Sequence, residues 1–251
     1  MRIAYVVPGV MEKSEMNRRE NLLQSWAFSN AKVEVVGVSE GPASIESKYE
    51  EYLSIPAASK KIYQLEKEGY DAVILGCAGD PGLDGIREIT NDMLVTGPGQ
   101  SSMQLAVMLG KKFSVLTVEE SAVDIFTELA YKAGVKNRLS SVKSLDIPVL
   151  DLSDNKEQVI NKLIKKGQTA VKEDRADVLI LGCMSLGFLE VAEKIEDQLD
   201  VPVINPSKTS LKITEAFVDV GLSHSKQAFM TPPKIKNGEA ESIEELYVSS
   251  K

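Results

Sequence analysis

The two cysteines of this chain stand at the ends of matching apolar runs. Ala72-Val-Ile-Leu-Gly-Cys77 closes the first run, Val178-Leu-Ile-Leu-Gly-Cys183 closes the second, and the sequence has no other cysteine. A lone cysteine at the end of a buried strand is commonly a small apolar residue without chemistry. Two cysteines in equivalent frames favour a functional pair, because a thiol has a pKa near the working pH and can both accept and donate a proton.

Two thiols that face each other across a cleft are suited to proton transfer at a carbon stereocentre. One thiolate removes a proton from one face of a carbon acid, and the thiol on the other face returns a proton, which inverts the centre. A racemase or epimerase needs this arrangement. A redox pair is the other chemistry open to two thiols, but the sequence has no Cys-x-x-Cys motif and the two cysteines are far apart in the chain.

The spacing of these features indicates a duplicated chain. Cys77 and Cys183 are 106 positions apart, and the apolar runs Ile3–Val7 and Phe113–Thr117 are 110 positions apart. We therefore expect two similar α/β domains related by a pseudo-two-fold axis. That symmetry would bring the two cysteines face to face across the cleft between the domains.

Short apolar runs between amphipathic segments predict the sheets that position the thiols. Runs rich in Val and Ile are typical of parallel strands that are buried on both faces, and the segment Asn155–Lys172 has the apolar spacing of a helix. This alternation indicates two parallel four-stranded sheets in an α/β fold. The predicted strands are Ile3–Val7, Val33–Val38, Ala72–Gly76, Met93–Val95, Phe113–Val118, Ile147–Leu150, Val178–Leu181 and Val201–Ile204.

Both cysteines fall at the carboxyl ends of predicted strands, where open parallel sheets bind their ligands. We expect Asp80 and Pro81 to begin a helix beside the first thiol and Ser185 to cap a helix beside the second. A helix dipole contributes about 0.3–1 kcal/mol, which lowers a thiol pKa by less than one unit, so further hydrogen-bond donors are needed. Polar residues at strand ends and helix starts could supply them, namely Ser101, Ser102, Thr117, Asn205, Thr209 and Ser210.

Composition and charge exclude several classes of protein. The 251 residues carry a formal net charge of −8, which argues against a nucleic-acid binder or a membrane-surface protein, because both need a basic face. No window approaches the roughly 20 apolar residues of a membrane span. The two cysteines cannot form a disulfide framework, so we expect a cytoplasmic protein with reduced thiols. His224 is the single histidine, and no Cys/His cluster has the spacing of a metal site.

Four motifs make the chain similar to the aspartate/glutamate/hydantoin racemase superfamily, and most closely to its hydantoin racemase branch. The motifs are Gly41-Pro42-Ala43-Ser44-Ile45-Glu46-Ser47, Gly76-Cys77-Ala78-Gly79-Asp80-Pro81-Gly82-Leu83 with Arg87-Glu88, Leu181-Gly182-Cys183, and Val201-Pro202-Val203-Ile204. The resemblance runs from the first strand to about residue 222. It implies two Rossmann-like domains, residues 1–97 plus 208–251 and residues 98–207, with the active site in the cleft between them. It also implies racemisation without pyridoxal phosphate or metal, with Cys77 and Cys183 as acid and base.

The chain departs from the hydantoin racemase pattern in the loops that hold substrate. Val7-Pro8-Gly9-Val10 stands where those enzymes usually have Asn-Pro-Asn followed by Thr or Ser, and Gln100 with Ser101-Ser102 replaces a Glu-Ala pair. The expected substrate contacts are therefore Pro8, Gly9, Ala78, Gly79, Ser101, Ser102, Thr117, Met184, Ser185 and Asn205. We expect Glu46 to be a helix-start or hinge carboxylate, not a catalytic group.

The leading hypothesis is a racemase or epimerase that acts on a small substrate, either a 5-substituted hydantoin or an amino acid. Decarboxylases and cis–trans isomerases of the same superfamily remain alternatives, although they commonly need only one cysteine. A non-catalytic protein that binds a small ligand on this fold is the alternative from another class. Homo-oligomer formation stays open.

Overall fold

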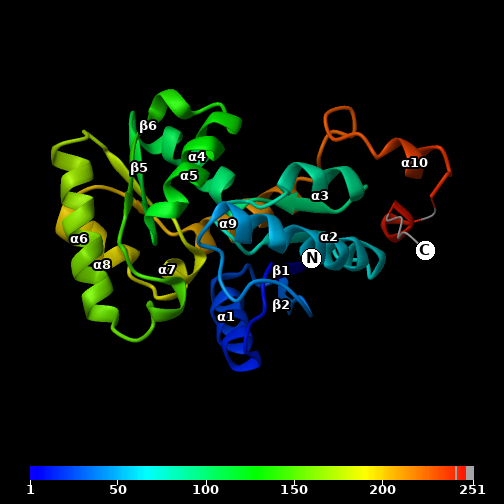
Figure 1. The fold of residues 1–251 in the computed structure, drawn as a ribbon, viewed down its shortest axis with the longest axis horizontal. Coiled ribbons are helices and arrows are strands. Elements are labelled where there is room, and N and C mark those ends of the chain that lie inside the picture. Colours follow the sequence, from blue (N-terminus) through cyan, green and yellow to red (C-terminus); the bar gives the residue numbers. More distant parts are fainter. Residues whose placement is uncertain (241, 247–251) are drawn as a thin grey trace.

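The chain forms two separate sheets of four parallel strands each, as a computed structural model of residues 1–240 and 242–246 shows (Figure 1). The first sheet contains β1 (Arg2–Val7), β2 (Lys32–Gly37), β3 (Ala72–Leu75) and β4 (Leu94–Thr96), in the order β2-β1-β3-β4. The second contains β5 (Phe113–Thr117), β6 (Leu139–Ser144), β7 (Val178–Leu181) and β8 (Val203–Ile204), in the order β6-β5-β7-β8. Both sheets have the same order, and the predicted α/β class is confirmed.

The strands form where the sequence is apolar without interruption. All four residues of β3 and all four of β7 are buried, as central strands covered by helices on both faces require. Their registers also correspond, since Tyr5 pairs with Ile74 in the first sheet and Val115 pairs with Ile180 in the second. The two runs that end in cysteine are therefore equivalent central strands.

The described residues contain ten α-helices. They are α1 (Lys13–Trp26), α2 (Lys48–Lys67), α3 (Leu83–Ile89), α4 (Pro98–Leu109), α5 (Val123–Lys132), α6 (Lys156–Lys172), α7 (Met184–Phe188), α8 (Ala192–Leu199), α9 (Pro206–Asp219) and α10 (Pro233–Lys236). Helix α6 confirms the predicted segment: Asn155 caps it, and Val159, Leu163 and Ala170 lie on its buried face. None of the described helices is both long and apolar enough to span a membrane.

Helix α9 follows the second sheet in sequence but packs against the first. It contacts β3 and β4, the Thr96 and Thr214 hydroxyls are 2.6 Å apart, and Glu215 accepts a hydrogen bond from the Phe28 N–H. Helix α4, by contrast, packs against β5 and β7 as well as α9. The division into 1–97 plus 208–251 and 98–207 stays a prediction. Within 208–251, residues 241 and 247–251 lie outside the described residues.

The predicted strand at Ile147–Leu150 is wrong. The strand that completes the second sheet is β6, and residues 145–148 form a loop that leads into a 3-10 turn, Val149–Asp151. Strand β6 lies at the sheet edge and is only half-buried along most of its length, so it carries Ser and Lys instead of an apolar run. Ile147 is apolar because it packs into the second hydrophobic core beyond the end of this strand.

The segment after α9 runs back along the first sheet. The Val95 N–H of β4 donates to the His224 imidazole at 2.8 Å. The Lys226 ammonium donates to the carbonyls of Arg87, Glu88 and Thr90 at 2.8–3.1 Å, and these carbonyls end α3. Two side chains of this segment therefore satisfy backbone groups of the first domain that would otherwise lack partners.

Candidate active site

A cavity of about 100 Å³ lies at the carboxyl ends of the central strands and is lined by both sheets. In the order β2-β1-β3-β4 the chain reverses direction across the sheet between β1 and β3, and such a switch point opens a crevice for ligands. The loops after β1, β3, β5 and β7 all reach this cavity. Of the expected site residues it brings together Pro8, Gly9, Cys77, Ala78, Gly79, Thr117, Cys183, Met184 and Ser185.

Three expected substrate contacts, Ser101, Ser102 and Asn205, do not line this cavity. Ser101 and Ser102 are buried in the first turns of α4. Asn205 caps α9: its side-chain oxygen accepts from the Ser207 and Lys208 N–H groups, and its amide donates to the Gly187 carbonyl. Capping of α9 accounts for Asn205 without a ligand, whereas the Ser102 hydroxyl is buried and has no hydrogen-bond partner among the described residues.

The Cys183 thiol lies where a helix begins. Cys183 is itself the N-cap of α7, so the expectation that Ser185 caps one longer helix is wrong; Glu190, with φ of 53°, separates α7 from α8. Burial raises the pKa of the Cys183 thiol, and hydrogen bonds from the Leu186 and Ser185 N–H groups act in the opposite direction. The Arg19 charge and the Ser185 hydroxyl also favour the thiolate.

The Cys77 thiol has a different environment, because no helix begins beside it. Helix α3 starts only at Leu83, after a turn in which Gly82 has a φ of 67°. Asp80 does not cap α3 as expected: its carboxylate accepts the Gly99 and Gln100 N–H groups at 2.9 and 2.6 Å, and so caps α4. Burial raises the pKa of Cys77 to about 12, opposed only by the Gly79 N–H.

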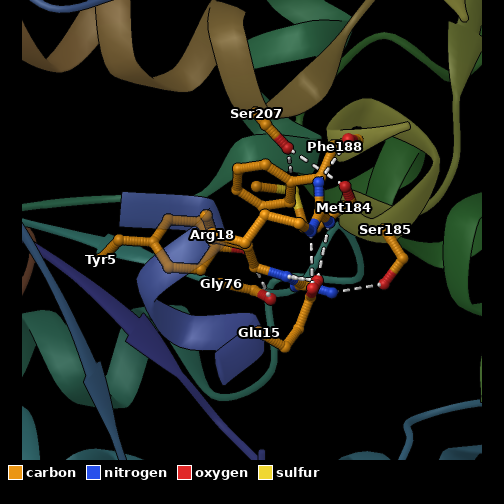
Figure 2. A network of polar contacts seen from close by, with 9 residues as sticks. Tyr5, Glu15, Arg18, Gly76, Met184, Ser185, Phe188 and Ser207 are labelled. Atoms are coloured by element: carbon orange, nitrogen blue, oxygen red, sulfur yellow. Dashed lines mark hydrogen bonds and ion pairs between the residues drawn. The ribbon is translucent and has the colours of Figure 1, made fainter. Parts of the chain in front are cut away.

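Arg19 is a site residue that the sequence analysis missed. It is buried in α1, donates to Glu15 at 2.7 Å and to the Ser185 hydroxyl at 3.0 Å, and stacks 4.8 Å from the Phe188 ring. Figure 2 shows Glu15 and Arg18 of α1 beside Ser185 and Phe188 of the second half. The run Asn17-Arg18-Arg19-Glu20 has the composition of a solvated helix face, so the sequence held no signal for this role.

The remaining cavity walls are largely apolar. They include Val10, Met11, Ile45, Ala122, Ile125, Phe126 and Val149. Ser44, Thr117 and Glu51 are the polar residues among them. The Thr117 hydroxyl at the end of β5 is fully buried and has no hydrogen-bond partner among the described residues, and the Glu51 side chain reaches the cavity from α2. The cavity thus favours a small, mostly apolar molecule with a few polar atoms.

Polar contacts join the two halves around this cavity. The Glu46 carboxylate accepts the Val149 N–H at 2.7 Å, and the Glu46 carbonyl accepts the Ser121 hydroxyl at 2.6 Å. The Arg18 guanidinium donates to the Phe188 carbonyl at 3.1 Å on the other side. Glu46 is therefore a contact between the halves and does not line the cavity. Among the described residues, no group of three His, Cys, Asp or Glu side chains could hold a metal ion.

Comparison with known proteins places this chain among racemases. The family model described as Asp/Glu/Hydantoin racemase matches residues 14–214. The hydantoin racemase of Pseudomonas sp. (strain NS671) is 40% identical over 207 residues, which cover 82% of each chain. That of Rhizobium meliloti is 31% identical over 79% of this chain and 81% of its own. The structure of allantoin racemase from Klebsiella pneumoniae superposes with a TM-score of 0.85 at 26% identity, covering 93% of this chain and 94% of that one.

Proposed function

The chain belongs to the Asp/Glu/hydantoin racemase family and is a racemase, and we propose that it racemises 5-substituted hydantoins with Cys77 and Cys183 as opposed base and acid. One observation carries this proposal. The two cysteines follow equivalent central strands of two separate sheets, and both line one cavity.

The reaction needs only the two thiols as proton carriers. The thiolate of one cysteine takes the C5 proton of the hydantoin, and the electron pair delocalises onto the adjacent ring carbonyl. The thiol of the other cysteine then donates its proton to the opposite face of C5. The product is the mirror image of the substrate, and the thiol and thiolate have exchanged places. No electron leaves the substrate, so the chemistry requires no redox cofactor.

The walls of the cavity favour a hydantoin over a free amino acid. An amino acid brings a carboxylate that needs a cationic partner, and Arg19 is the guanidinium that lines the cavity. That guanidinium already pairs with Glu15 and stacks on Phe188. A hydantoin ring has no carboxylate, and an apolar substituent at C5 would pack against Val10, Ile45 or Phe126.

Circular dichroism on enantiopure substrates tests this function. Purified protein is incubated with D- and L-5-isobutylhydantoin, D- and L-5-benzylhydantoin, and D- and L-leucine, and the optical signal is followed against samples without protein. We expect the signal of the hydantoins to decay to zero and that of leucine to persist. A signal that persists in every sample would contradict the proposal and favour a ligand-binding protein. Release of carbon dioxide from an arylmalonate would favour a decarboxylase instead.

A further inference from the structure

Glu51 is a buried acidic residue on the helix face that packs inward. Its residue exposure is 8%, and Ser54, Ala58 and Ile62 share this face of α2. A carboxylate removed from water is costly unless it is paired. Its partner is the Lys48 ammonium, 3.1 Å from the Glu51 Oε2, but that ammonium also pairs with Glu128 at 2.8 Å. Oε2 accepts no hydrogen bond from the described residues.

The helix itself does not need this carboxylate. The neighbouring Glu50 accepts the Glu46 N–H and the Ser47 hydroxyl, and the Ser47 hydroxyl accepts the Glu50 N–H, so these residues cap the start of α2. Glu51 caps nothing and instead lines the cavity that contains both cysteines. The Glu51 charge acts on the first thiol, because it adds to the effect of burial in raising the pKa of Cys77.

A second buried polar group, the Thr117 hydroxyl, lines the same cavity. The Thr117 residue is fully buried, and its hydroxyl makes no hydrogen bond to the described residues. Buried polar atoms are nearly always hydrogen-bonded in folded proteins, so an unpaired group that lines a cavity points to a partner outside the chain. Glu51 can only accept hydrogen bonds, whereas Thr117 can also donate one. The missing partner must therefore offer a donor to Glu51, and a partner that also carries an acceptor would let Thr117 donate.

We propose that Glu51 is a specificity residue that accepts a hydrogen bond from a ring N–H of the substrate, while Thr117 donates to a ring carbonyl. The inference rests on the proposed function and narrows its substrates to hydantoins that keep a free N–H at the contacted ring nitrogen. Such rings carry N–H donors and C=O acceptors on one rigid frame.

Binding of a substrate analogue that cannot react tests this role directly. 5,5-Dimethylhydantoin has no proton at C5, so calorimetry reports its binding without turnover. The probes are this compound and its N1-methyl and N3-methyl derivatives, each titrated into the wild-type chain, Glu51→Gln and Glu51→Met. Glu128→Gln is the matched control, because it removes the other carboxylate on Lys48 and does not line the cavity.

We expect Glu51→Met to weaken binding of 5,5-dimethylhydantoin about 10- to 100-fold, as for a lost hydrogen bond to a charged group, and Glu51→Gln to weaken it less. Methylation of the nitrogen that Glu51 contacts should weaken binding to the wild type, and it should weaken binding to Glu51→Met much less. Glu128→Gln should bind all three compounds as the wild type does. Equal methylation penalties in the wild type and Glu51→Met, at both nitrogens, would overturn the inference.

Racemisation of D-5-isobutylhydantoin, measured on the same samples, separates this inference from the proposed function. If the chain racemises this hydantoin but methylation of either nitrogen weakens binding equally in the wild type and Glu51→Met, only the role of Glu51 is refuted. If the methylation penalty depends on Glu51 but the chain does not racemise the hydantoin, the racemase reaction is refuted and the role of Glu51 stands. Loss of both would overturn both. A far-ultraviolet circular dichroism spectrum of each variant shows that it is folded before it is titrated.

Discussion

At the scale of single residues, the two thiols are equivalent by position and unequal by environment. Cys183 begins a helix and lies beside Ser185 and Arg19, whereas Cys77 meets only the Gly79 N–H. Burial raises the pKa of both thiols, to about 12 for Cys77, but the Arg19 charge and two helix N–H groups favour the thiolate at Cys183. In the free protein, Cys183 is therefore the better candidate for the resting thiolate.

Alkylation rates should reveal this inequality. Iodoacetamide reacts with the thiolate, so Cys183 should be modified at a lower pH than Cys77. Replacing the nearby cation by Arg19→Gln should move the pH midpoint of Cys183 upward and leave that of Cys77 nearly unchanged. Mass spectrometry of the two cysteine peptides after timed exposure between pH 7 and 11 follows how the rate of modification at each cysteine rises with pH. Faster modification of Cys77 below pH 9 would contradict the assignment.

Hydrogen exchange at C5 should separate the roles of the two thiols. Cys77→Ser and Cys183→Ser should each abolish racemisation, because a serine hydroxyl is far less acidic than a thiol and cannot replace it as base or acid. Each variant retains one thiol, so it should exchange the C5 proton of one enantiomer only. Proton NMR of each pure enantiomer in deuterated water follows the exchange. The opposed-thiol mechanism fails if both variants exchange the same enantiomer, or if either racemises at the wild-type rate.

At the scale of structural elements, the loop that carries Cys77 is fixed by a cap on a different helix. Asp80 is three residues after Cys77, and it caps α4. Asp80→Ala should lower the free energy of unfolding by about 1–2 kcal/mol, the usual cost of losing a capping side chain. Urea unfolding measures this loss. Asp84→Asn is the control, because its side chain is 68% exposed and it should change stability by less than about 0.5 kcal/mol.

The sequence predicts the central elements well because their burial leaves a continuous apolar signal. Strands β3 and β7, helix α6 and the place of both cysteines follow directly from that signal. Edge strand β6 was missed because a half-buried strand has no such run. Asp80 was assigned to the wrong helix because a cap is recognised from sequence only when it precedes its own helix. Arg19 and Glu51 could not be found, since only the fold turns these two helical charges towards the cavity.

At the scale of the whole molecule, His224 makes stability depend on pH. Burial, aided by the Arg87 charge, lowers the pKa of this imidazole to about 4, and its Nε2 accepts the Val95 N–H. The unfolded chain takes up a proton near pH 6.5, whereas the folded chain does so only near pH 4, so stability should fall as the pH drops through this window. The contribution is about 1–2 kcal/mol, reduced because the ring is only partly buried.

Urea unfolding between pH 7 and pH 4.5 measures this dependence. His224→Gln keeps a hydrogen-bond acceptor but cannot titrate, so its stability should fall less over the same range than that of the wild type. Because His224 is the only histidine, the difference between the two curves isolates its effect from the carboxylates. Parallel curves for the two proteins would rule out the role of His224.

The unequal thiols place a strict condition on the complete catalytic cycle. Two enantiomers in free solution have the same energy, so the equilibrium constant of racemisation is one, and no arrangement of the protein can change it. The ratio kcat/KM must therefore be identical for the D- and L-forms of a substrate with one stereocentre. Cys183 has Arg19 and a helix start beside it, whereas Cys77 has neither. This asymmetry can make kcat and KM differ between the two enantiomers, but only by the same factor in both. Initial rates should show that the enantiomer with the larger kcat has a KM larger by the same factor.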